Sequence, residues 1–200
     1  MFQVISLLSQ VTVAVLCIVL YKKYKNQKFY VFFLTLIVLI AVVELVGTYF
    51  IYTDVDSHYM SYFFVFFQGV FSMLMFKFLL KKNKIVYFLF SLFFFFWIYY
   101  FKDREAFDIV VIMGSINIAV FSLLHLRELL MSDKIFVYKK ILPFWVSVAF
   151  LIFYLSSVPF FSMLNFMHTR GLFFVLYILI ILMNTFIIYG LLCSKKEEKY

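Results

Sequence analysis

One carboxylate, Glu44, stands in the otherwise apolar stretch VLIAVVELVGTYF, residues 38–50, in which eleven of the thirteen residues are apolar or glycine. Burying a carboxylate in hydrocarbon is costly, so such residues usually face a cavity and mark a site. A carboxylate surrounded by amides, hydroxyls and tyrosines can bind a proton, a cation, an amine or a small polar molecule. Glu44 is therefore the first candidate for a ligand-binding residue.

Further polar side chains recur in the other apolar stretches, at a depth close to that of Glu44. Glu44 lies about 8 residues from the predicted outer end of its stretch, or roughly 12 Å at the rise of an α-helix. Ala41, Gly47 and Thr48 share one helical face with it, and small or hydroxyl residues mark the face that packs on other helices. We therefore expect one polar pocket in the outer half of a helix bundle. Its predicted members are Glu44, Gln68, Gln10, Asn117, Ser157, Tyr154 and Asn184.

The alternative is that these amides and hydroxyls only hold helices together, as interhelical hydrogen bonds commonly do. If the pocket exists, Phe64 and Phe71, on the same helical face as Gln68, could add a cation–π wall. We find no paired acid and base, no Ser–His pair and no metal cluster in the apolar stretches, so we expect neither an enzyme nor a cofactor. His125 is expected at the membrane interface.

A possible metal-binding pattern occurs between the second and third apolar stretches. In the segment TDVDSHYM, Asp54, Asp56 and His58 stand at alternating positions, which suits metal ligation. The same composition is typical of any polar loop, and we favour the loop interpretation.

The composition indicates which elements must position these side chains. The chain has 200 residues, of which 66% are hydrophobic and 24% aromatic, including 31 Phe. A soluble domain is about half apolar, so the composition predicts an integral membrane protein that associates with the lipid bilayer. The net charge of +8 does not indicate nucleic-acid binding, because the basic residues cluster in short connections between apolar runs.

Seven apolar runs approach the roughly 20 residues that a membrane-spanning helix needs. The sequence therefore predicts a single all-α domain, residues 1–200, built as a bundle of seven transmembrane helices. The fourth run is short but almost entirely aromatic and aliphatic. The predicted helices are 2–20, 29–52, 61–80, 85–101, 108–126, 144–163 and 172–193.

The distribution of basic residues predicts the orientation of this bundle. Of the 18 Lys and Arg residues, 15 fall on one side of the predicted membrane and 3 on the other. Basic residues are retained in the cytoplasm, so we expect the N-terminus outside and the C-terminus in the cytoplasm. Pro143 is expected in the first turn of the sixth helix, where its missing N–H does no harm.

The segments LLHLRELL and KKILPFWVSVAFLIFYLSSVPFF carry a resemblance to a known group. Through Glu128, Pro143, Phe144, Trp145 and Tyr154 they resemble uncharacterised small membrane proteins of Bacteroidota. The resemblance covers about 40 residues. It implies a seven-helix, sensor-like module of the bacterial inner membrane, often associated with two-component histidine kinases, and it assigns no ligand.

The leading functional hypothesis is a membrane sensor or regulatory module that binds a small ligand or ion near Glu44, Gln68 and Gln10. Only seven residues follow Cys193, so we expect the output to pass through connection 127–143 to a histidine kinase or another membrane signalling partner. A small transporter or channel that uses Glu44 as a coupling or coordinating group is the alternative. A lipid-modifying enzyme would need convergent acids or a metal motif, and the sequence shows neither. A structural subunit would use the polar residues only for packing.

Overall fold

The described residues form helices in almost their whole length. The computed structural model describes residues 2–53, 58–81, 83–100, 107–132, 138, 140–163 and 173–194. The helices are α1 (Phe2–Val19), α2 (Tyr21–Tyr24), α3 (Lys28–Thr53), α4 (His58–Leu79), α5 (Asn83–Tyr99), α6 (Phe107–Leu130), α7 (Leu142–Met163) and α8 (Phe173–Cys193). The all-helical class predicted from the sequence is confirmed.

Six of these helices, namely α1, α3, α4, α6, α7 and α8, are long and apolar enough to cross a membrane. Their apolar spans hold 18 to 24 residues, which at 1.5 Å per residue approaches or exceeds the thickness of a bilayer core. Helix α5 has 17 residues, or about 25 Å, and is shorter than the other six. The structure thus shows a multi-pass bundle, and a seventh crossing stays a prediction.

The contacts between the six long helices form a closed ring. Helix α1 packs on α3 and α8, α3 packs on α4, and α4 packs on α6. Helices α6 and α7 pack together, and α7 closes the ring against α8. Helix α5 packs only against α4 and α6 among the stronger helix contacts, so it lies on the outside of the ring.

Helix α5 is held in place by one aromatic ring. Phe93 is buried between α4 and α6, where it lies against Gly69 and Gly114. A Cβ at position 69 would lie 2.5 Å from the Phe93 ring, and one at position 114 would lie 3.3 Å from it. Both glycines therefore provide room for the ring, as small residues do where membrane helices approach closely.

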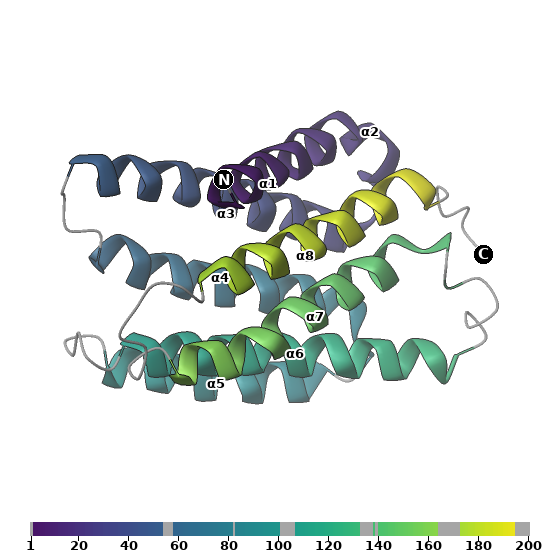
Figure 1. The fold of residues 1–200 in the computed structure, drawn as a ribbon. Helices are drawn as coiled ribbons and strands as arrows, with labels where there is room; N and C mark the ends of the chain where they lie inside the picture. Colours follow the sequence, from purple (N-terminus) through teal and green to yellow (C-terminus); the bar gives the residue numbers. More distant parts are fainter. Residues whose placement is uncertain are drawn as a thin grey trace.

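The two ends of the bundle differ in charge. The turns after α1, after α4 and after α6 lie at the end where α8 finishes (Figure 1). We call this the basic end, because the described basic residues lie there or within the adjacent turn. They are Lys22, Lys23, Lys25, Lys28, Lys77, Lys81, Lys84, Arg127 and Lys140. Pro143 occupies the first turn of α7, as predicted.

A set of buried aromatic rings, which we call the aromatic layer, lies in the half of the ring nearer the basic end. Phe33, Phe76, Phe121 and Phe150, from α3, α4, α6 and α7, are each at most 1% exposed. The centroids of Phe33 and Phe150 are 6.4 Å apart, and those of Phe76 and Phe121 are 5.6 Å apart. These rings belong to the buried hydrophobic core that fills the ring between its opposite half and the basic end.

Candidate functional site

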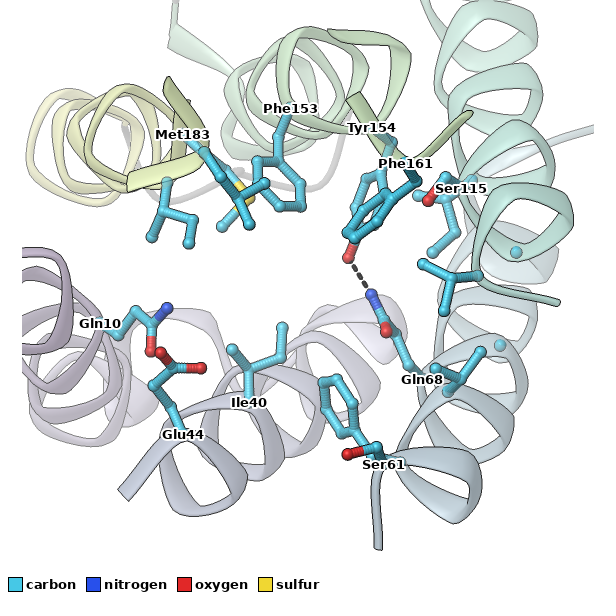
Figure 2. Close-up of a pocket in the computed structure, with 18 of the residues that line it drawn as sticks. Gln10, Ile40, Glu44, Ser61, Gln68, Ser115, Phe153, Tyr154, Phe161 and Met183 are labelled. Carbon is cyan, nitrogen blue, oxygen red and sulfur yellow. Dashed lines mark hydrogen bonds between the residues drawn. The ribbon is translucent and has the colours of Figure 1, made fainter. Parts of the chain in front are cut away.

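A cavity of ≈ 260 Å³ lies inside the ring, in the half opposite the basic end (Figure 2). All six ring helices contribute to its lining. It therefore occupies the place where the sequence predicts a polar pocket, at the depth of Glu44.

Four of the seven predicted site residues line this cavity, namely Gln10, Glu44, Gln68 and Tyr154. Gln10 and Glu44 come from α1 and α3, and Figure 2 shows the oxygens of their side chains directed toward one another. Gln10 is buried, whereas Glu44 is half-buried. Phe64, predicted as an aromatic wall, also lines the cavity.

A hydrogen bond ties α4 to α7 on another side of the cavity. Gln68 Nε2 donates to the hydroxyl oxygen of Tyr154, which is buried (Figure 2). Because this hydroxyl accepts a hydrogen bond, its own proton is left to donate elsewhere. The pair thus fixes the Tyr154 side chain and presents a hydroxyl donor beside the cavity.

The other three predicted site residues do not belong to the described lining. Asn117 Nδ2 donates to the Leu89 carbonyl of α5, at 3.0 Å. Asn184 Nδ2 donates to Ser9 Oγ at 2.8 Å and so joins α8 to α1. Ser157 Oγ donates to the carbonyl of Tyr154 at 3.0 Å, within its own helix. For these residues the expectation of one shared pocket is not met, because their side chains form contacts elsewhere.

The rest of the lining is mainly apolar and aromatic. Sequence reasoning missed Ser115, although it follows Gly114 on α6, and it also missed Phe107, Phe153 and Phe161. Isolated aromatic residues in a Phe-rich chain carry no signal that separates a cavity wall from a lipid-facing surface. Among the described lining residues, Glu44 is the only charged side chain.

Between the cavity and the basic end, the ring is packed with buried apolar side chains. The aromatic layer lies below the cavity, and nearby hydroxyls bond to carbonyls of their own helices. Ser72 Oγ donates to the Gln68 carbonyl at 2.6 Å, and Ser122 Oγ donates to the Ile118 carbonyl at 2.8 Å. Because these hydroxyls are buried and bonded within their own helices, they do not form a polar path through the layer.

Known proteins offer no match. No family model, curated protein or solved structure is significantly similar to this chain.

A second cavity, of ≈ 430 Å³, lies at the basic end. The corner between α2 and α3 and the neighbouring ends of α4, α6 and α7 line it, with Lys28, His125 and Glu128 among the side chains. Glu128 Oε2 accepts a hydrogen bond from the backbone N–H of Lys81 at 2.9 Å, which ties α6 to the corner after α4. This cavity includes part of the predicted output connection 127–143.

His125, expected at the membrane interface, is buried inside the bundle, and its Nδ1 lies 2.7 Å from Ser147 Oγ of α7. Its depth relative to a membrane interface stays a prediction. Asp54 and Asp56 lie outside the described residues, so their arrangement with His58 is not placed.

Proposed function

We propose that this chain is a membrane sensor or regulatory module that binds a small ligand or ion in the cavity beside Glu44. The observation that carries the proposal is that this cavity gathers Glu44, Gln10, Gln68 and Tyr154 inside a ring whose core toward the basic end is filled by buried apolar side chains. A blind pocket with a lone carboxylate suits recognition better than passage.

The distribution of charge supports an outward-facing cavity. If the basic end faces the cytoplasm, the cavity lies in the outer half, with the N-terminus outside and the C-terminus inside. This orientation needs seven crossings, so α5 would be the seventh. A helix of about 25 Å can span a bilayer that thins locally by a few ångströms, and α5 packs alongside α4 and α6.

The output would leave through the basic end. Helices α6 and α7 both line the ligand cavity and both reach the second cavity near residues 127–143. A ligand that binds one arrangement of these helices better than another shifts their equilibrium. The partner would be a histidine kinase or another membrane signalling protein, as the resemblance implies.

A small transporter or channel is the second candidate, and the cavity at the basic end is the observation that favours it. A transport site needs access to each side in turn, and two cavities at opposite ends could serve as two vestibules. The buried aromatic layer between them opposes this function unless the helices move.

The test compares the proteins that co-purify with the wild type and with a variant in which a larger side chain fills the cavity. Ile180→Phe adds bulk to the buried cavity wall of α8, and Ile178→Phe makes the same change on an exposed face of the same helix. We expect a signalling protein to co-purify from native membranes in near-equal amount with the wild type and the Ile178→Phe control. We expect Ile180→Phe to change its recovery or its cross-links to residues 127–143. Recovery of the chain alone, together with solute flux in liposomes that Ile180→Phe abolishes, would contradict the sensor and establish the transporter.

A further inference from the structure

We propose that the ligand of the outer cavity is a small organic ammonium ion, whose nitrogen is held between the Glu44 carboxylate and the carboxamide oxygen of Gln10. The proposal rests on the function proposed above and specifies its ligand class. It follows from the unpaired acceptor of Gln10, the charge of the lining and the character of the walls.

The first observation is an unpaired acceptor. Gln10 is 5% exposed, and its Oε1 has no hydrogen-bond partner among the residues that the structure describes. This oxygen points toward the carboxyl group of Glu44 (Figure 2). A buried acceptor without a partner is costly, and two facing acceptors need a hydrogen between them. A ligand N–H directed at both oxygens satisfies this requirement.

The second observation is the charge of the lining. Glu44 has neither a Lys, an Arg nor a His beside it in the described wall of the cavity. An anionic ligand would therefore meet an uncompensated carboxylate, whereas a cation would neutralise it. Buried charges in proteins are normally paired, and here the ligand would provide the pair.

The third observation is the chemistry of the cavity walls, which favours an organic cation over a metal ion. A hard metal ion such as Ca²⁺ takes roughly six to eight oxygen ligands, and this lining is mostly apolar and aromatic. The apolar part of a ligand could pack against Phe64, Phe153 and Phe161, and these rings can add cation–π attraction to its ammonium group. Since a cavity of about 150 Å³ holds benzene, ≈ 260 Å³ accommodates a molecule of roughly ten non-hydrogen atoms.

The Tyr154 hydroxyl adds a second point of recognition. It accepts from Gln68 and keeps its own proton for an acceptor atom elsewhere on the ligand. Gln10 comes from α1, Glu44 from α3 and Tyr154 from α7. An amine that reaches both groups would link the α1–α3 side of the ring to the α7 side.

Two arrangements without a ligand could also satisfy the facing oxygens. A protonated Glu44 could donate to Gln10, or the Gln10 carboxamide could turn over and donate to Glu44. In either case the pair would only join α1 to α3, and no ammonium ion would bind. The experiment therefore compares charged and neutral probes of the same shape.

We would measure equilibrium binding to the purified chain in lipid nanodiscs, using 2-phenylethylammonium, neutral 2-phenylethanol and anionic phenylacetate. We expect the ammonium probe to bind at least tenfold more tightly than the alcohol, and phenylacetate not to bind. Glu44→Gln should weaken ammonium binding at least tenfold. Asp108→Asn, which removes a carboxylate at the same end of the bundle without altering the described lining, should leave binding unchanged.

A second variant keeps the test decisive if Glu44→Gln fails to fold. Gln10→Met removes the acceptor but keeps Glu44, and it should weaken ammonium binding severalfold in protein with unchanged helical circular dichroism. Equal binding of ammonium and alcohol, independent of Glu44, would overturn the ammonium assignment while leaving a ligand cavity and the proposed function intact. Absence of binding by any probe to the folded wild type would also overturn the assignment, and the capture experiment with Ile180→Phe would then decide the proposed function separately.

Discussion

His125 and Ser147 form a polar contact inside an apolar bundle. The ring nitrogen and the hydroxyl are 2.7 Å apart, both residues are buried, and the ring also lies 6.5 Å from that of Phe76. The contact joins α6 to α7 just below the aromatic layer, on the side of the basic end. The pair therefore stabilises the packing of α6 on α7, the two helices that we propose to carry the signal.

Ser147→Ala should therefore destabilise the bundle by about 1 to 3 kcal/mol, because it removes a partner of a buried polar ring. Thermal unfolding in detergent, or unfolding in mixed micelles, would measure the change. Ser162→Ala is the matched control on α7, since Ser162 is exposed and donates only to the Val158 carbonyl of its own helix. Equal effects of the two substitutions would contradict a structural role for the His125–Ser147 contact.

Residue type and depth were enough to predict Glu44, Gln10, Gln68 and Tyr154 as neighbours, because polar groups in hydrocarbon gather where they can be satisfied. They were not enough for Asn117 or Asn184. One residue along a helix turns a side chain by about 100°, so the helix that an amide faces depends on the packing of the whole ring. Asn117 faces α5 and Asn184 faces α1, which no local pattern indicates.

The contact between α7 and α8 depends on a glycine. A Cβ at Gly190 would lie 2.5 Å from Trp145 Cβ, an atom next to the backbone of α7. The Trp145 ring also stacks on Phe186, with centroids 6.2 Å apart, and meets Tyr189 edge to face at 4.6 Å. Trp145 therefore fits into a groove of α8 that exists only because residue 190 has no side chain.

Gly190→Ala should force α8 away from α7 and destabilise the bundle by about 1 to 3 kcal/mol, as overpacking does. Gly47→Ala is the control, because its Cβ would meet only Met60 Cε, at an ordinary 3.8 Å. Thermal melts of both variants in the same detergent would measure the difference. A Gly190→Ala protein as stable as Gly47→Ala would contradict the close approach.

Hydropathy was sufficient to place most helices within a few residues, since an apolar run must be covered by lipid or by other helices. Helix α6 continues to Leu130, past the predicted end at 126, because its polar residues Arg127 and Glu128 lie at the basic end, where water or partners satisfy them. The place of α5 outside the ring was not predictable. It depends on Phe93 meeting Gly69 and Gly114, a contact between three helices.

The bundle as a unit is asymmetric along its axis. One half holds a cavity beside a lone carboxylate, and the other half carries the buried aromatic rings, the basic residues and a second, more polar cavity. We propose that water and small solutes reach the first cavity from outside the cell and stop at the aromatic layer.

Cysteine accessibility tests this claim most directly. Ser115 lines the cavity and Ser122 lies deeper on the same helix, beside the aromatic layer. Each would be replaced by cysteine in a Cys193→Ser background, in which the remaining thiol, Cys17, is buried. A membrane-impermeant methanethiosulfonate would be applied to either face of the membrane. We predict that Ser115→Cys reacts from outside and that Ser122→Cys reacts from neither side. An unreactive Ser115→Cys, or one that reacts only from the cytoplasmic side, would contradict an outward-facing blind cavity.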